Sequence, residues 1–410
     1  MAEETGSRDW AWLPDHILES ILKNLVSLQD YLWFSTVCKP WHAAAKSQKR
    51  RRIATSPQKQ VPLLLVPTQD RSHERRSLYC ATRGDKLLPT KLRIPWQYRR
   101  CCGSSHGWLA FEEDDFGITL YNPLTGARIS LPVTRSSNNF RTIEYHRRKS
   151  QYLAKKVVLS ADPSTHPQDY MVAAVLKYDV FRTLVVIRPG RDDQNWTQFT
   201  QWTNWTYLQG WPLLAELIIH EGDWVYATGD GGVLARANVE GVGTADYQPR
   251  LELVVPKWCN PLPTMALHYI VEPSRGDELL MIVRWFENIG NKYGVVTRVT
   301  NDIKVFKLVR GGGSSFLEVE DLNGDAVFIG DSHSVAIPTT EFEGCEADTV
   351  YYTEDHEDVA HNYDQDDIGK FNIKNKRFKG KKFRTHHVLS KAPNSEMPHP
   401  IWIFPTLKQS

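Results

Sequence analysis

Residues 103–107 (GSSHG) carry the clearest catalytic pattern in the sequence, the G-x-S-x-G motif whose middle serine, here Ser105, is a nucleophile. In that motif a strand leads into a sharp turn, and a helix follows the serine. Residues 108–111 (WLAF) form a short apolar run that predicts a strand instead. We therefore expect Ser105 to be a structural residue, and we predict no catalytic residue in the chain.

Two other short patterns suggest chemistry, but their neighbours do not support it. Cys101 and Cys102 have no acid or base close by in the sequence, so packed or surface thiols are expected. Residues 311–315 (GGGSS) lack the lysine and the spacing of a phosphate-binding loop, and they predict a flexible turn.

Opposite charges are concentrated in two neighbouring segments near the C-terminus. Residues 354–367 hold seven acidic side chains and two histidines, and residues 374–384 hold seven basic side chains. The acidic segment suggests a metal site, but it lacks the Asp-x-Asp-x-Asp-Gly register and the terminal glutamate of a calcium loop. We expect a solvated loop there, with the basic segment facing it or water, and we predict no metal and no cofactor.

Aromatic side chains crowd residues 196–211, where polar residues separate four tryptophans, one phenylalanine and one tyrosine. Tryptophan and tyrosine bury large areas and carry a polar group, so they occur in binding hot spots as well as in cores. Two interpretations stay open: packing within the fold, or substrate contact through Trp202, Trp205 and Tyr207. Substitution of Trp202 and Trp205 should unfold the domain in the first case, and only abolish substrate capture in the second.

The overall composition is that of a globular protein. The 410 residues are 41% hydrophobic and 24% charged, and the formal net charge of +2 argues against an electrostatic grip on nucleic acid. No apolar run reaches the roughly 18–20 residues of a membrane helix, and residues 1–10 lack the apolar segment of a secretory signal. The six cysteines show no metal-ligand spacing, so we expect reduced thiols and a location in the cytoplasm, the nucleus or both.

The length predicts two or three domains, and the periodicity of the sequence changes near residue 60. In residues 9–50 apolar side chains recur from Ile17 with the spacing i, i+1, i+4, i+5 and i+8, which forms one stripe along an α-helix. Two further helices are expected, from residue 27 to about residue 38 and from residue 40 onward. Three short helices cannot bury all of these side chains among themselves, so a partner surface is expected.

In residues 61–406, short runs rich in β-branched and aromatic residues alternate with clusters of Gly, Pro, Asn and Asp. We expect strands at 63–66, 107–111, 117–121, 128–131, 157–160, 170–176, 183–188, 217–220, 224–228, 233–237, 252–255, 267–271, 279–286, 303–309, 326–330, 349–353 and 401–404. So many short strands predict a closed or radially repeated fold, and they fit a propeller of five or six four-stranded blades. The predicted fold class is α+β and multidomain: a small three-helix domain followed by a large all-β domain.

Residues 51–60 lie between the two parts and follow the basic run 49–52 (KRRR). We predict a basic linker there, or the end of the third helix. The basic run is either a solvated helix end or a nuclear localisation signal. An unchanged distribution of a fluorescent fusion after deletion of the run would exclude the signal.

The helical part resembles an F-box. The resemblance rests on residues 13–18 (LPDHIL), on Ile21 and Leu22, and on residues 37–41 (VCKPW), which agree with the F-box pattern in type and separation. It covers about 40 residues.

The remainder resembles plant F-box proteins that carry a C-terminal β-propeller-like domain of unknown function, the DUF295 type. The strings that carry this resemblance, in order, are 107–109 (GWL), 120–126 (LYNPLTG), 129–132 (ISLP), 156–160 (KVVLS), 188–190 (RPG), 223–227 (DWVYA), 326–330 (AVFIG), 350–353 (VYYT) and 401–405 (IWIFP). Each string is a generic turn-and-strand signal, and their order is specific. The stretch from Trp196 to Trp211 departs from the pattern because it is longer.

These resemblances imply the substrate-recognition subunit of a Skp–cullin–F-box ubiquitin ligase. The F-box would dock on a Skp-type adaptor and through it on a cullin, while the β domain would capture an unknown protein substrate for ubiquitination. The residues expected to contact the adaptor are Leu13, Pro14, Ile17, Leu18, Ile21, Leu22, Val37, Cys38 and Trp41. The chain itself would not be an enzyme, and neither nucleic acid nor a membrane is an expected partner. A propeller-type hydrolase with an incidental helical lead and a scaffold with a silent F-box stay open as alternatives.

Overall fold

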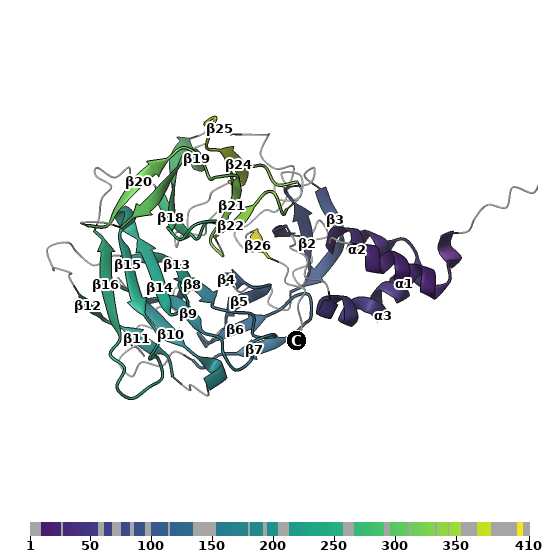
Figure 1. The fold of residues 1–410 in the computed structure, drawn as a ribbon, viewed down its shortest axis with the longest axis horizontal. Coiled ribbons are helices and arrows are strands. Elements are labelled where there is room, and N and C mark those ends of the chain that lie inside the picture. The colour runs from purple at the N-terminus through teal and green to yellow at the C-terminus, as the bar shows by residue number, and fades with distance from the viewer. Residues whose placement is uncertain are drawn as a thin grey trace, which may run out of the picture.

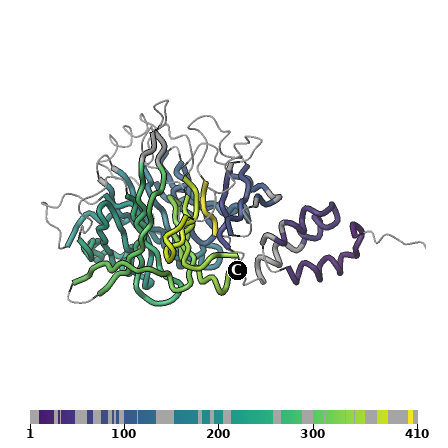
Figure 2. The backbone as a smooth tube through the Cα atoms, turned by 90° about the horizontal axis from the view of Figure 1, so that it is seen from above, coloured from purple at the N-terminus to yellow at the C-terminus, as the bar shows by residue number. Residues whose placement is uncertain are grey.

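A computed structural model of the chain describes most of its residues. The described ranges are 10–25, 28–55, 61–67, 75–82, 86–94, 100–113, 115–133, 153–178, 181–191, 195–203, 213–256, 266–290, 296–310, 313–332, 334–342, 344–353, 367–378 and 400–404. The chain forms a small helical part beside a large ring of β-sheets (Figures 1 and 2).

Three helices form the N-terminal part, as the sequence predicts. They are α1 (Asp15–Asn24), α2 (Leu28–Thr36) and α3 (Lys39–Thr55), preceded by a short 3-10 turn, η1 (Trp10–Trp12). Pro14 precedes α1, and its carbonyl oxygen accepts hydrogen bonds from the amides of Ile17 (2.9 Å) and Leu18 (3.2 Å). Pro40 lies in the first turn of α3, where a missing N–H costs little. Because α3 continues to Thr55, it includes the first half of the range predicted as a linker, 51–60.

The β part is a propeller of six sheets, the upper of the two predicted blade numbers. Blade A contains β26 (Ile401–Ile403), β1 (Leu63–Pro67), β2 (Arg75–Cys80) and β3 (Lys86–Arg93). Blade B contains β4 (Cys101–Ser105), β5 (Trp108–Glu112), β6 (Ile118–Tyr121) and β7 (Arg128–Ser130). Blade C contains β8 (Ala154–Leu159), β9 (Val172–Tyr178), β10 (Phe181–Ile187) and β11 (Thr197–Phe199).

The other three blades complete the ring. Blade D contains β13 (Leu214–His220), β14 (Trp224–Gly229), β15 (Leu234–Asn238), β16 (Arg250–Val255) and β12 (Gln201–Thr203). Blade E contains β17 (Ala266–Val271), β18 (Leu280–Gly290), β19 (Val296–Val309) and β20 (Ser315–Val319). Blade F contains β22 (Val335–Pro338), β21 (Asp325–Ile329), β23 (Thr349–Tyr352), β24 (Gly369–Asn372) and β25 (Arg377–Phe378). The short 3-10 turns η2 (Pro189–Arg191) and η4 (Asp230–Gly232) lie between strands.

The last strand closes the ring by pairing with the first. In blade A, β26 is antiparallel to β1, with Trp402 opposite Leu64. The Trp402 side chain is fully buried, and its indole N–H donates to the carbonyl oxygen of Ile329 in blade F (3.1 Å). The closure therefore holds blade A to blade F as well as the two ends of the propeller to each other.

Two blades depart from a simple up-and-down order. The chain leaves blade C at β11 and forms β12 parallel to β16, at the outer edge of blade D, before it returns as β13. In blade F, β21 runs parallel to β23, and β22 pairs with the other edge of β21. The loop between β21 and β22 contains Asp331. Strands β4, β8 and β13 lie toward the middle of the ring (Figure 1).

One hydrophobic cluster joins the helical part to the propeller. The members from the helices include Leu18, Leu22 and Phe34, and those from blades A and B include Leu65, Leu78, Leu92 and Leu109. Helix α2 lies directly against β3. Packing between sheets buries many strands on both faces, as in β8, β21 and β23, where every residue is buried.

Candidate functional site

The residues predicted to bind an adaptor fall into two groups in the structure. Leu18 and Leu22 are buried at 0% and 4% exposure, and Leu13, Ile21 and Trp41 are half-buried against the same cluster. Cys38 is half-buried as well. Pro14, Ile17 and Val37 are exposed, so these three are free to meet a partner, while the buried ones hold the helices together.

Three further tryptophans of the helical part are exposed and are missing from the predicted set. Trp10, Trp12 and Trp33 are 62%, 76% and 46% exposed. Of the eight large hydrophobic side chains exposed in the described part of the chain, five lie in the helical part. We call them the F-box patch: Trp10, Trp12, Ile17, Trp33 and Val37. Two tryptophans on either side of an alanine, just before the Leu-Pro pair, were a signal that the sequence offered.

Side-chain contacts fix the position of the 3-10 turn that carries two of these tryptophans. The indole N–H of Trp41 donates to the carbonyl oxygen of Trp10 (2.9 Å), and its ring packs on Phe34 with centroids 4.5 Å apart. The thiol of Cys38 points to the carbonyl oxygen of Ala11 at 3.8 Å. These contacts of Trp41 and Cys38 hold the 3-10 turn against the helices, and contact of either residue with an adaptor stays a prediction.

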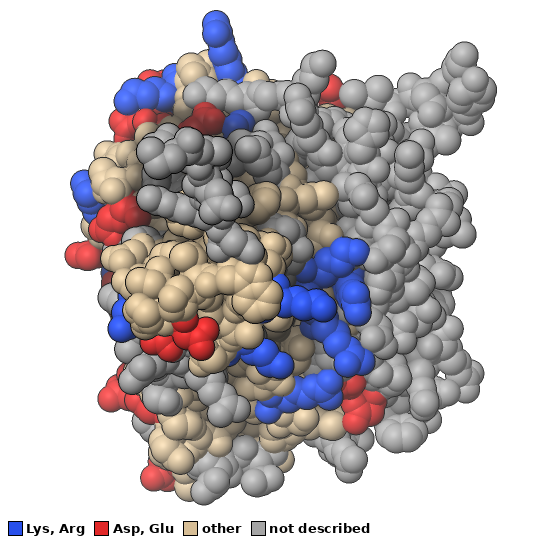
Figure 3. Space-filling model, turned by 90° about the vertical axis from the view of Figure 1, so that its right-hand side faces the viewer, with Lys and Arg blue, Asp and Glu red and all other residues tan. Residues whose placement is uncertain are grey.

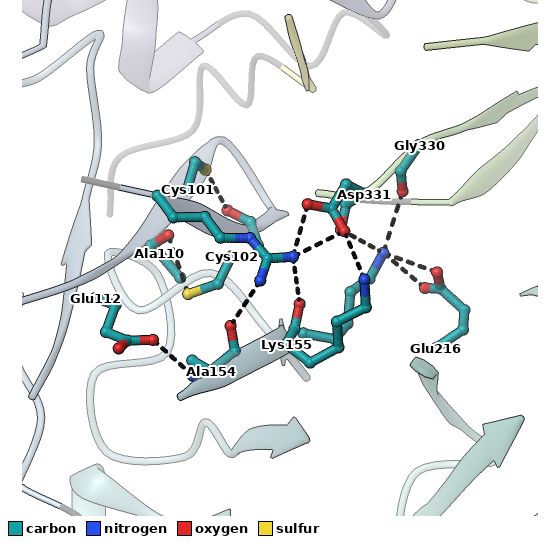
Figure 4. Close-up of polar contacts among 12 residues, drawn as sticks. Cys101, Cys102, Ala110, Glu112, Ala154, Lys155, Glu216, Gly330 and Asp331 are labelled. Atoms are coloured by element: carbon teal, nitrogen blue, oxygen red, sulfur yellow. Dashed lines mark hydrogen bonds and ion pairs between the residues drawn. The ribbon is translucent and has the colours of Figure 1, made fainter. Parts of the chain in front are cut away.

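A second cluster of functional side chains lies at the propeller axis (Figure 4). Arg100, just before β4, donates to both carboxylate oxygens of Asp331 at 2.9 and 2.7 Å. The ammonium of Lys155 on β8 lies 3.5 Å from the same carboxylate. The guanidinium of Arg100 also donates to the carbonyl oxygens of Ala154 and Lys155, at 3.4 and 3.3 Å.

A buried ion pair extends this axial cluster into blade D. Lys156 is 1% exposed, and its ammonium lies 2.8 Å from the carboxylate of Glu216 on β13. The same ammonium donates to the carbonyl oxygens of Gly330 and Asp331, at 3.3 and 3.1 Å. A side chain at Gly330 would collide with Thr353, because a Cβ there would lie 2.2 Å from its hydroxyl. The axial cluster therefore connects blades B, C, D and F in one network.

The charges of the axial cluster keep the Asp331 carboxyl ionised. Burial raises the pKa of the Asp331 carboxyl, but the nearby charges of Arg100 and Lys155 outweigh burial and hold it well below its ordinary value of 3.8. A carboxylate held by two cations cannot take up a proton as a general base near neutral pH. The arrangement is suited to bracing blades against each other.

The G-x-S-x-G motif at residues 103–107 is followed by a strand, as the neighbouring sequence predicts. Ser105 ends β4, a two-residue turn follows, and β5 begins at Trp108, so the residue after the turn starts a strand. The buried Ser105 hydroxyl accepts a hydrogen bond from the amide of Leu159 (3.3 Å). Burial raises the pKa of Cys101 to about 12, and that of Cys102 well above its usual range. These thiols are packed against the backbone and stay protonated.

The aromatic stretch is described only in part. Trp202 lies on β12, half-buried against the core between blades C and D, and the Trp196 indole donates to the carbonyl oxygen of Pro132 (2.7 Å). Trp205 and Tyr207, the other predicted substrate contacts, lie outside the described residues, so substrate binding by this set stays a prediction. Trp202 packs where the chain passes from one blade to the next.

The acidic segment 354–367 ends on a buried ion pair, which its composition did not indicate. Residues 354–366 lie outside the described residues, but Asp367 is 5% exposed and its carboxylate lies 2.9 Å from the guanidinium of Arg284, which is fully buried. Asp367 also accepts a hydrogen bond from the amide of Thr300 (2.7 Å). At this residue the expectation of a solvated loop is wrong, because the carboxylate pairs with a buried arginine.

The described ranges contain no candidate metal site and no candidate membrane-spanning helix. No group of three or more His, Cys, Asp or Glu side chains there could hold a metal ion. No helix in the same ranges is long and apolar enough to cross a membrane.

Comparison with known proteins identifies both parts of the chain. Residues 76–372 match the family described as KIB1-4 beta-propeller, and residues 10–53 match the F-box domain. The F-box protein SKIP23 of Arabidopsis thaliana is 30% identical over 129 residues, 30% of this chain and 29% of that protein. The F-box protein At2g05970 of the same plant is 26% identical over 140 residues, 33% of this chain and 35% of that protein. The matches thus span about a third of these relatives.

Among solved structures, the β-propeller domain of Cps50 (Swd1) from Myceliophteria thermophila is similar at 13% identity. The TM-score is 0.33, with 61% of this chain and 71% of that chain covered. A likeness of this size supports no conclusion about function.

Proposed function

Because the chain belongs to the KIB1-4 β-propeller family and carries an F-box in front of the propeller, we propose that it is the substrate-recognition subunit of a Skp–cullin–F-box ubiquitin ligase. The F-box binds a Skp-type adaptor, which connects the chain to a cullin. The propeller captures a protein substrate for ubiquitination, and the chain itself catalyses no reaction.

The F-box patch is the observation that carries this proposal. Large apolar side chains left in water are costly, and a cluster of them is typical of a surface that a partner covers. Trp12 and Ile17, at 76% and 39% exposure, are candidates for the anchors that dominate binding energy. The axial cluster does not support the hydrolase alternative, because the carboxylates of Asp331 and Glu216 are both held in ion pairs.

Co-purification of the full chain with a Skp-type adaptor tests the proposal. A Trp12→Ala/Ile17→Ala variant should lose about 2 kcal/mol or more of binding free energy, roughly a thirtyfold weaker affinity. Leu317→Ala on β20 is the matched control, because Leu317 is also exposed, at 61%, but belongs to blade E. That control should bind the adaptor as the wild-type chain does.

Two results would count against the proposal. Failure of a folded wild-type chain to retain the adaptor would show that the F-box is silent and would support the scaffold alternative. Equal retention of the adaptor by the patch variant and by the Leu317→Ala control would show that the F-box patch is not the docking surface.

A further inference from the structure

The strands of the propeller nearest the F-box carry a one-sided charge. The strands of blades A and B, the two blades that share a hydrophobic cluster with the helices, hold six Lys or Arg residues and a single acid, the buried Glu112. Four of the basic residues are exposed, and we call them the basic strip: Arg75, Lys91, Arg93 and Arg128. The whole chain has a net charge of only +2, so this concentration is local.

Strand register places like charges directly next to each other in the basic strip. Arg75 on β2 is paired with Arg93 on β3. Lys91 lies two residues from Arg93 on the same face of β3, at a spacing of about 7 Å. Like charges directly opposite each other destabilise a sheet. The register thus gathers three cations on one part of blade A, and an anionic partner would complement them.

Contacts between blades extend the strip from blade A to blade B. The hydroxyl of Tyr121 on β6 donates to the carbonyl oxygen of Arg93 (3.1 Å). The guanidinium of Arg128 on β7 lies 5.9 Å from the centre of the same ring. Tyr121 thus holds Arg93 and Arg128 on one continuous part of the outer surface.

The basic strip lies next to the F-box. Helix α2 packs on β3, the strand that carries two of the four basic residues, and α2 itself contains a single acid, Asp30. The view toward the F-box side of the molecule shows a group of Lys and Arg side chains at the right-hand border of the described surface, with acidic side chains at its lower end (Figure 3). A protein seated on the F-box would therefore have the strip as its neighbour.

We propose that the basic strip is a second contact for the adaptor, and that it binds an acidic segment of that protein. This inference rests on the proposed function, because the F-box patch must first bring the adaptor to this side. Arginine matches carboxylates in planar, two-bond geometry, and opposite potentials increase association rates most at low salt. The strip therefore speeds docking and fixes orientation, while the F-box patch supplies most of the affinity.

The test is the salt dependence of adaptor binding by charge-reversal variants of the full chain. Arg75→Glu/Arg93→Glu should weaken adaptor binding about tenfold at 50 mM salt and less than threefold at 500 mM. Arg250→Glu/Arg275→Glu is the matched control, with the same change in charge at two exposed arginines of blade D and the β17–β18 turn. It should bind as the wild-type chain does at both salt concentrations.

A single variant guards against misfolding. Arg75→Glu places a carboxylate opposite Arg93, so it should keep or raise the melting temperature while it weakens adaptor binding at low salt.

Each alternative gives a different pattern. Equal adaptor affinity of the strip variant and the control at 50 mM salt would overturn the inference and leave the proposed function intact. Absence of adaptor binding by the wild-type chain would overturn both. Binding of a 20-nucleotide RNA by the wild-type chain and its loss in the strip variant, with adaptor affinity unchanged, would assign the strip to nucleic acid instead.

Discussion

The F-box and the propeller axis each hold side chains in a costly environment, and the two environments are opposite in kind. The F-box leaves large apolar side chains in water, with Trp12 at 76% exposure. The axis buries charged side chains, with Lys156 at 1% exposure. At the axis every charge has a partner on another blade, so the cost of burial is met within the chain. In the F-box, no described residue covers the exposed apolar side chains.

Under the proposed function, this difference separates a binding surface from a brace. An exposed apolar patch contributes little to folding, so its removal should weaken the binding of a partner and leave stability nearly unchanged. A buried ion network contributes little net energy when complete, but it is very sensitive to the loss of one member. Stability and binding should therefore respond to different residues.

The largest effect is expected at the axis. Asp331→Ala would leave Arg100 and Lys155 buried without their carboxylate, which should lower the free energy of unfolding by about 3–5 kcal/mol. Chemical denaturation of the full chain measures this. Lys304→Ala, which breaks an exposed pair with Glu318, is the control and should cost at most about 1 kcal/mol. Equal stability of the two variants would show that the axial cluster is not a brace.

A smaller loss is expected in the core that joins the two parts. Leu22 is 4% exposed and packs in the cluster shared by the helices and blades A and B. Leu22→Ala should cost about 3 kcal/mol of unfolding free energy through the lost burial and the cavity left behind. The same denaturation experiment checks this. A loss of adaptor binding without a loss of stability would mean that Leu22 contacts the adaptor directly.

Acid should weaken the propeller through a buried histidine. Burial lowers the pKa of His268 on β17 to about 4, while an unfolded histidine titrates near 6.5. Between these values the unfolded chain binds a proton that the folded chain does not, so stability falls as pH falls. The loss attributable to His268 is about 2 kcal/mol between pH 7 and pH 5. His268→Gln should reduce the measured loss by that amount, and an unchanged pH profile would contradict the assignment.

The smallest effect on stability is expected from the F-box patch. Trp12→Ala removes a side chain that is 76% exposed, so the unfolding free energy should change by no more than about 0.5 kcal/mol. A loss of 2 kcal/mol in thermal or chemical denaturation would mean that Trp12 packs within the fold, and the patch would then be smaller than described.

Sequence patterns predicted the helices and most of the apolar strands, because periodicity reports burial on one or both faces. They missed β4 (CCGSS), whose small and polar residues show no alternation although all five are buried near the axis. They also missed β2 and β3, where basic residues interrupt the apolar pattern. Burial there is imposed by neighbouring blades, which a local pattern does not contain.

The candidate sites were predictable to different degrees. The F-box motif located the helical domain, but not the division into buried Leu18 and exposed Ile17, because adjacent apolar residues on one helix look alike in sequence. The axial cluster was not predictable, since Arg100, Glu216 and Asp331 are more than 100 residues apart and meet only when the ring closes. Its members look like ordinary surface charges until the topology is known.

The most direct test measures adaptor affinity and unfolding free energy on the same two variants, Trp12→Ala/Ile17→Ala and Asp331→Asn. We expect the first to lose about thirtyfold in affinity with stability nearly unchanged, and the second to lose stability with affinity nearly unchanged. Wild-type affinity in the first variant, or weakened adaptor binding by the folded form of the second, would contradict the separation of docking surface and brace.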